Sequence, residues 1–196
     1  MLHDAPASHH LDLYRCWVNK RGDKPMPARC DIEAADIPAL LAFMEIIDKV
    51  DGRLHYRLIG TSAAQQLGRD LTGKFVGSYI KSPEFAPKLR AAYGSVFATG
   101  QPVFLTGEYV AGSGSIHSMS QLVLPLSDDR INVNMIIFVR IARFQAGACW
   151  QNDHLDRVPA RICSAVTVSA IADVEKCCRD WERQTAISKG LTVGRA

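Results

Sequence analysis

The polar residues that could do chemistry are scattered along this sequence. His117 is the best placed, because it alternates with other residues on a predicted strand and shares one face with Met119 and Gln121. Small-ligand sites use a few such polar groups to orient a molecule inside an apolar pocket. These three residues are therefore candidates for lining a pocket. The alternative interpretation, an exposed strand histidine beside serines, stays open.

The other histidines form no catalytic or metal-binding pattern. His55 alternates with apolar strand residues and is expected to face solvent, His9 and His10 lie near the N-terminus, and His154 is isolated. No group of His, Cys, Asp and Glu has metal-ligand spacing, and no nucleophile motif or phosphate-binding loop occurs. We expect no metal site and no enzymatic activity. A small α+β enzyme that uses His117 as an acid–base residue remains a weaker alternative.

The composition excludes several classes of protein. The 196 residues are 47% apolar and 22% charged, as in an ordinary globular protein. The net charge of +3 is spread along the chain, which argues against a nucleic-acid partner. No signal-peptide pattern occurs, and the longest apolar run, residues 135–139, is too short to span a membrane. Six cysteines without a C-x-x-C pair indicate reduced thiols, so we expect a cytoplasmic protein without membrane association.

The candidate residues must be positioned by a small sheet and one long helix, which we place in residues 43–141. Asp51-Gly52 is a strong turn signal between strands at 44–50 and 53–60. Apolar residues recur every three or four positions over 83–99, which predicts a helix with one apolar face. Three alternating segments then predict a meander of strands at 103–110, 116–126 and 131–141.

Several of these elements could face a common pocket. Tyr56 lies on the second strand, Leu89 and Tyr93 lie on the apolar face of the long helix, and Met135 lies on the last strand. The candidate pocket residues are therefore Tyr56, Leu89, Tyr93, His117, Met119, Gln121 and Met135. Aromatic residues at such spacing also occur in ordinary cores, so a cavity filled by the protein's own side chains is the alternative.

Two further segments flank the predicted sheet. Residues 1–42 contain a helix from about 8 to 20, a proline-containing linker and a short helix after Asp36. Residues 142–196 form an extension with an ambiguous segment at 158–168 and an amphipathic helix at about 169–185. Tyr14, Trp17 and Trp181 are large aromatics on these terminal helices. They could contact a second copy or a partner protein, or they could pack on their own domain.

Three motifs give the chain a family resemblance. After Trp17 come PARCDIEAADIPALL (27–41), YRLIGTSAAQQLGRDLTG (56–73) and QLVLPLSDD (121–129). With this order of elements, the chain resembles a PAS domain, and more specifically a bacterial subfamily of small stand-alone PAS-fold proteins. The resemblance covers roughly residues 10–141. It implies an α+β fold with a five-stranded antiparallel sheet and helices on one face, plus an N-terminal helix and a C-terminal helical extension.

The resemblance also implies a sensory or regulatory role. Such a domain would bind a small metabolite between its sheet and its helices and would signal through a homodimer and a partner protein. A dimerisation or adaptor module without a ligand is the alternative. A haem-binding PAS domain takes an axial histidine from the long helix, and residues 83–99 contain none. No cysteine occurs between residues 31 and 148, which argues against a photoactive flavin and a thiol-linked chromophore. The cofactor, if one is bound, stays unknown.

Overall fold

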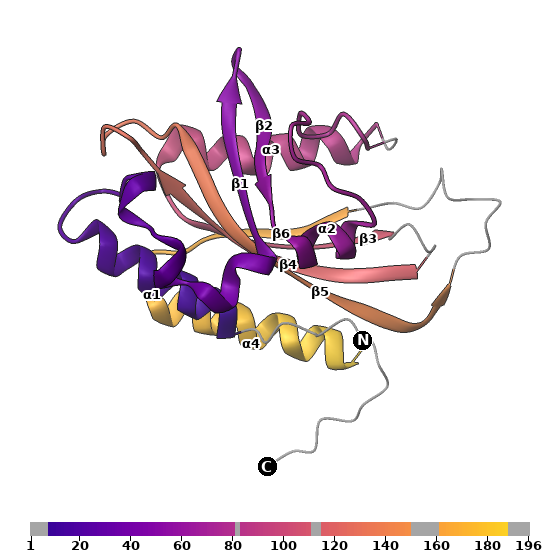
Figure 1. The fold of residues 1–196 in the computed structure, drawn as a ribbon. Coiled ribbons are helices and arrows are strands. Elements are labelled where there is room, and N and C mark those ends of the chain that lie inside the picture. The colour runs from indigo at the N-terminus through magenta and orange to yellow at the C-terminus, as the bar shows by residue number, and fades with distance from the viewer. Residues whose placement is uncertain (1–7, 81–82, 111–114, 150–160, 188–196) are drawn as a thin grey trace.

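The chain folds around one six-stranded antiparallel sheet with strand order β2-β1-β5-β4-β3-β6 (Figure 1). A computed structural model describes residues 8–80, 83–110, 115–149 and 161–187. The strands are β1 (Met44–Val50), β2 (Arg53–Ile59), β3 (Val103–Val110), β4 (Ser115–Leu126), β5 (Met135–Cys149) and β6 (Arg161–Thr167). The helices are α1 (Ser8–Arg21), α2 (Thr61–Leu67), α3 (Phe85–Thr99) and α4 (Ile171–Ile187), and three short 3-10 helices, η1 (Arg29–Asp31), η2 (Ala34–Asp36) and η3 (Pro38–Phe43), follow α1.

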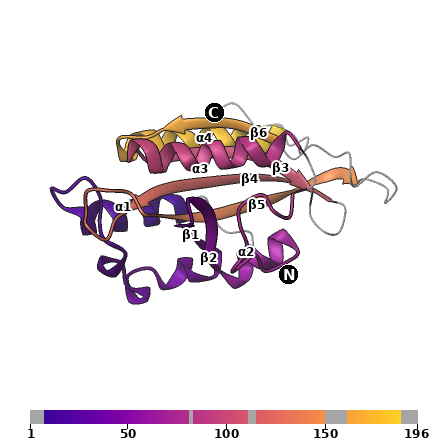
Figure 2. The ribbon, with the colours of Figure 1, turned by 90° about the horizontal axis from the view of Figure 1, so that it is seen from above.

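The predicted α+β class and antiparallel sheet are confirmed, but the sheet has six strands instead of five. The extra strand, β6, pairs with β3 and lies at the edge of the sheet opposite β2 (Figure 2). It comes from the segment at 158–168 whose sequence was ambiguous. Its β-branched residues Val166 and Thr167 fit an extended edge strand, and this preference outweighs the helical tendency of the alanines.

The last predicted strand is displaced along the chain. β5 begins at Met135, four residues later than expected, and continues past residue 141 to Cys149. The late start has a local cause, because the Asp129 carboxylate accepts hydrogen bonds from the backbone N–H groups of Ile131 at 2.9 Å and Asn132 at 2.7 Å. These bonds hold the β4–β5 connection as a turn and prevent it from pairing with the sheet.

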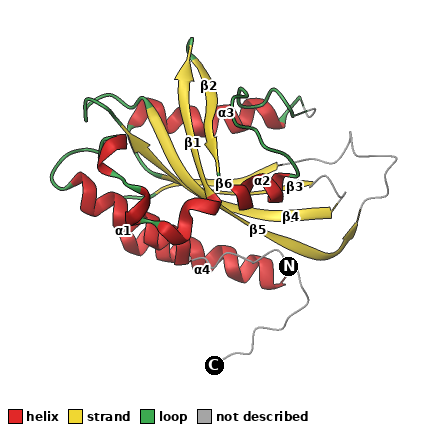
Figure 3. Cartoon of the chain, viewed as in Figure 1, coloured by secondary structure: helices red, strands yellow, loops and turns green. Residues whose placement is uncertain are grey.

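Helices cover both faces of the sheet (Figure 3). On one face α3 and α2 pack through residues such as Leu89, Tyr93 and Val96. On the other face α1 and α4 pack through Leu13, Trp17, Val174 and Trp181. The strands therefore contribute apolar side chains to two cores, which we call the α3-side core and the α1/α4-side core.

The glycine-rich motif after β2 fixes how the chain leaves the sheet. A Cβ atom on Gly60 would lie 2.5 Å from the carbonyl oxygens of Leu41 and Ala42, so only glycine fits at this position. After α2, the chain returns to the edge of β2, where Tyr56 donates its N–H to the Lys74 carbonyl at 2.9 Å and Val76 donates to the Leu54 carbonyl at 2.9 Å. This return brings the segment that contains Tyr79 over the α3-side core.

Candidate functional site

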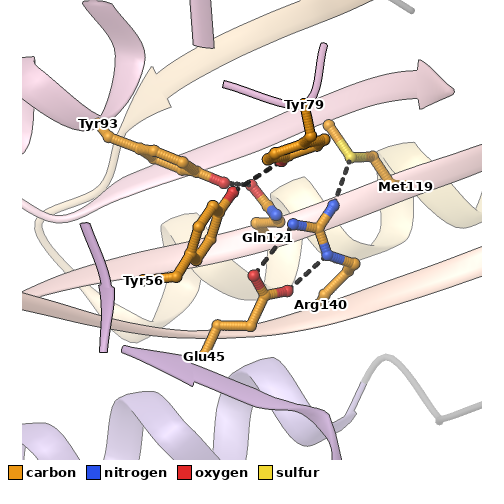
Figure 4. A network of polar contacts seen from close by, with 7 residues as sticks. All are labelled: Glu45, Tyr56, Tyr79, Tyr93, Met119, Gln121 and Arg140. Carbon is orange, nitrogen blue, oxygen red and sulfur yellow. Dashed lines mark hydrogen bonds and ion pairs between the residues drawn. The ribbon is translucent and has the colours of Figure 1, made fainter. Parts of the chain in front are cut away.

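Polar side chains meet inside the α3-side core, where the sheet faces α3 (Figure 4). They come from β1, β2, β4, β5, α3 and the segment after β2. We call this group the core polar cluster, and it consists of Glu45, Tyr56, Tyr79, Tyr93, Met119, Gln121 and Arg140. All except Tyr79 are buried, and Tyr79 is half-buried.

An ion pair between two neighbouring strands forms the base of the cluster. Arg140 on β5 donates from Nε to Oε1 of Glu45 on β1 at 2.5 Å and from Nη2 to Oε2 at 3.1 Å. The two side chains are only 4% and 0% exposed. Burial opposes the charge of Arg140, but the adjacent Glu45 carboxylate outweighs burial and keeps the pKa of Arg140 above its ordinary value. The guanidinium is therefore a permanent cation inside the core.

Gln121 links this cation to the tyrosines. When its amide oxygen faces Arg140, it accepts hydrogen bonds from Nη2 at 2.9 Å and from Nη1 at 3.2 Å, and the amide nitrogen donates to the Tyr93 hydroxyl at 3.0 Å. The opposite orientation places the amide nitrogen against the donors of Arg140. The first orientation satisfies every partner, so we assign it.

The three tyrosines supply neutral hydroxyl groups. Tyr56 and Tyr79 share a hydrogen bond of 3.0 Å between their hydroxyl oxygens. Burial raises the pKa of Tyr56, Tyr79 and Tyr93 above the ordinary value of tyrosine, so these hydroxyls keep their protons at physiological pH. The cluster can therefore donate hydrogen bonds to a polar molecule and can orient it against a fixed positive charge. No nucleophile activated by a general base is present in the cluster.

The structure brings five of the seven predicted pocket residues together. Tyr56, Tyr93, Met119 and Gln121 belong to the cluster, and Leu89 packs in the same core. His117 lies two residues beyond Met119 on β4, is half-buried, and pairs across the sheet with Tyr109 and Phe144. It makes none of the cluster's hydrogen bonds described above.

Met135 lies on the wrong face for a pocket residue. It belongs to the α1/α4-side core with Ile137 and Val139, whereas Ile136 and Phe138 face α3. Alternation along β5 correctly predicted two sets of side chains. Both sets are apolar, so alternation could not show which set faces α3.

The predicted partner-contact residues also pack inside the chain. Tyr14, Trp17 and Trp181 are between 2% and 5% exposed and belong to the α1/α4-side core. Trp17 donates its Nε1–H to the Pro125 carbonyl at 2.7 Å, which satisfies the polar end of this buried ring. In this conformation the three aromatics attach the terminal helices to the sheet.

Sequence reasoning missed Glu45, Tyr79 and Arg140. The available signal was a single charged residue in each of two strongly apolar stretches, with Glu45 in MEII and Arg140 in IIFVRIA. A charge between buried neighbours needs a partner, and these were two unpaired charges of opposite sign. Nothing in the sequence indicated Tyr79, because it lies in an irregular segment, beyond the last residue of that segment that pairs with β2.

In the part of the chain that the structure describes, no group of three or more His, Cys, Asp or Glu side chains could hold a metal ion. Within the same ranges, no helix is long and apolar enough to cross a membrane.

Comparison with known proteins identifies the family. A family model described as a PAS domain matches residues 5–137. No curated protein sequence matches this chain. A solved light-oxygen-voltage (LOV) protein of Rhodobacter sphaeroides is 9% identical, with a TM-score of 0.45, and the match covers 82% of this chain and 96% of that protein.

Two other solved structures are similar at the same low level. A light-oxygen-voltage domain studied with a flavin analogue is 15% identical, with a TM-score of 0.45 over 62% of this chain and 88% of that one. An RNA-binding light-oxygen-voltage receptor is 14% identical, with a TM-score of 0.38 over 71% of this chain and 34% of that one. The assignment rests on the family match, which spans more than half of the sequence. The chain therefore belongs to the PAS domain family.

Proposed function

We propose that this chain is a sensory or regulatory PAS protein that binds a small polar molecule at the core polar cluster. PAS domains are generally sensory and not enzymatic, and the family match extends this coarse role to the chain. The observation that carries the proposal is the buried Arg140, which faces α3 beside Gln121 and three tyrosine hydroxyls. These groups converge in the space where the family resemblance implies a ligand.

The energetic cost of the cluster supports a functional role. Removing two charges from water costs several kcal/mol for each ion, and a buried pair of apolar residues is often equally stable or more stable. Packing alone does not require Glu45 and Arg140 at this position. A site that recognises a polar molecule does require preformed donors and a fixed charge in an apolar surrounding.

Displacement of the Tyr79 side chain would open a route from solvent to the buried cluster. The strand-like pairing of its segment ends at Val76, and Gly77 then adopts a positive φ of 85°. Beyond that point, the backbone bonds of the segment are local turns, such as the bond from the Ile80 N–H to the Gly77 carbonyl at 3.2 Å. The Tyr79 hydroxyl is held by Tyr56, and losing one such neutral hydrogen bond costs about 0.5–1.5 kcal/mol. Displacing Tyr79 would expose the cluster to a ligand.

The test begins with the purified full-length protein. Native mass spectrometry and an absorbance scan show any retained molecule, and a thermal-shift screen of small polar metabolites identifies further ligands. Stabilisation by a ligand follows RT ln(1 + [L]/Kd), or about 2.7 kcal/mol at a hundredfold excess over Kd. We expect Gln121→Leu and Tyr79→Phe to reduce the ligand-induced shift, because each removes a polar group of the cluster.

Ile137→Val is a matched control, because it trims a buried side chain on the same strand as Arg140 but on the opposite face of the sheet. It should lower the melting temperature of the free protein without changing the ligand-induced shift. Equal loss of that shift in the control and in the cluster variants would remove the cluster from the site.

A second candidate function is an interaction module without a ligand. It is favoured by the complete burial of Tyr56, Tyr93 and Gln121, whose side chains fill the core. A protein with no retained mass, no absorbance and no thermal shift across the panel would support it.

In either case we propose that the chain acts in the cytoplasm as a homodimer with a signalling partner. Sedimentation of the full chain tests the dimer.

A further inference from the structure

The two edges of the sheet differ in how they are covered. At the β2 edge, the chain's own return segment pairs with the strand, because Gly73 donates its N–H to the Tyr56 carbonyl at 2.8 Å and Val76 donates to the Leu54 carbonyl at 2.9 Å. At the opposite edge, β6 pairs with β3 on one side. Among the residues that the structure describes, no strand pairs with the other side of β6. This strand is therefore the open edge of the sheet, and it lies beyond the part of the chain that matches the family model.

The pairing with β3 determines which backbone groups of β6 face outward. Val168 donates its N–H to the Pro102 carbonyl at 3.0 Å, so its backbone groups point toward β3. The register is regular from Ser164 to Thr167, and alternate residues of a strand direct their backbone groups to opposite sides. Ala165 and Thr167 therefore direct their N–H and carbonyl groups away from β3. Both residues are exposed, so a strand laid along this edge can form hydrogen bonds with them.

The side chains of β6 do little to block this edge. Natural proteins protect open edges with lysine, proline or other charged residues, and residues 162–168 contain none of these. A bulge at Cys163 interrupts the register and limits the regular edge to residues 164–168. Val166 is 44% exposed, and Ile171 in the first turn of α4 is 37% exposed. An uncharged edge with exposed apolar side chains favours pairing with another strand.

We propose that β6 pairs antiparallel with β6 of a second copy, and that this pair is the interface of the homodimer proposed above. A second copy fits because a twofold axis brings the same uncharged segment to both sides, so no like charges oppose each other. When Ala165 lies opposite Thr167 of the second copy, the outward groups of both residues are all hydrogen-bonded. This register places Val166 opposite Val166 of the second copy and covers both exposed side chains.

Sedimentation of the full chain over a range of concentrations measures the dimer. Val166→Lys places two lysines opposite each other across the axis, and we expect it to weaken the dimer at least about tenfold. Val50→Lys is the matched control, because Val50 is 38% exposed but lies at the end of the β1–β2 hairpin. It should leave the dimer unchanged.

Ala165→Pro tests the backbone pairing. The N–H of Ala165 faces away from β3, so its loss costs the single copy no ladder hydrogen bond, and proline is tolerated at such positions of edge strands. The dimer loses one hydrogen bond from each copy. We expect this variant to weaken the dimer at least about tenfold as well.

A cross-link tests the register. Residues opposite each other in a non-hydrogen-bonded antiparallel pair have Cα atoms about 4.5 Å apart, which suits a disulfide. Val166→Cys should therefore form a disulfide-linked dimer on mild oxidation, whereas Ile131→Cys, at a position 75% exposed on the β4–β5 turn, should not. Both variants also carry Cys30→Ser and Cys163→Ser, because these two native cysteines are exposed.

The outcomes separate this interface from the rest of the proposed function. The inference rests on the proposed homodimer, so a wild type that is monomeric at every concentration would refute both. A dimer that Val166→Lys and Ala165→Pro do not weaken, or a Val166→Cys protein that does not cross-link, would refute the β6 interface alone. The ligand-induced thermal shift is measured on the same variants and should be unchanged, because β6 contributes no residue to the core polar cluster.

Discussion

Replacing Glu45 with glutamine preserves the shape of the side chain and removes the negative charge that faces Arg140. The guanidinium then remains 4% exposed, without the two carboxylate contacts at 2.5 and 3.1 Å. Breaking a buried ion pair in this way costs about 3–5 kcal/mol. For a chain of this length, that loss lowers the melting temperature by roughly 6–20 °C.

The double variant Glu45→Leu/Arg140→Met removes both charges. It should be more stable than Glu45→Gln, because a buried pair of apolar side chains is often as stable as the ion pair that it replaces. Stability is measured by urea unfolding followed by circular dichroism, with equal m-values required for the comparison.

The exposed pair Lys176–Asp180 provides the control, since its side chains are 73% and 42% exposed. Asp180→Asn should cost less than about 1 kcal/mol. The reasoning is refuted if Glu45→Gln costs no more than this control, or if the double variant is no more stable than Glu45→Gln.

Two further predictions concern single positions. Gly60→Ala should destabilise the fold by about 1–3 kcal/mol or more, because the new Cβ atom would meet two backbone oxygens at 2.5 Å. Gly94→Ala, within α3, should stabilise the fold by about 0.5–1 kcal/mol, because its Cβ atom would meet nothing within 4 Å. Thermal melts of both variants check this pair, and equal losses would contradict it. Burial, followed by the neighbouring His9, lowers the pKa of His10 from 6.5 to about 3, so the unfolded chain takes up a proton below pH 6.5 that the folded chain does not. The stability of the wild type should therefore fall by about 2 kcal/mol more than that of His10→Gln between pH 7 and pH 5, as measured by urea unfolding; parallel losses would contradict this.

The sequence alone predicted the elements that are determined by neighbouring residues. The Asp51-Gly52 turn, with both residues at positive φ, and the helical period of 83–99 place β1, β2 and α3 within two residues of their observed ends. The motif from 56 to 73 identified the family, and Gly60 shows why the motif needs a glycine. These features depend on contacts between near neighbours or on one strict steric requirement.

The features that the sequence did not predict depend on contacts between distant parts of the chain. Glu45 and Arg140 are 95 residues apart, and only the adjacency of β1 and β5 makes them partners. Met135 was placed on the wrong face, because β5 is apolar on both sides. Arg140 was the one residue that could have marked the α3 side. The edge strand β6 has few buried residues, so its hydrophobic pattern is weak.

The length of β5 has a practical consequence for expressing fragments of this protein. The PAS match ends at residue 137, whereas β5 runs on to Cys149 and pairs with β4 through most of that length. A fragment trimmed to the match would cut this strand after its third residue and would remove Arg140, β6 and α4. Trp17, Phe104 and Leu122 would lose their cover, and the product should aggregate. We therefore expect a stable fragment to extend to the end of α4 at Ile187.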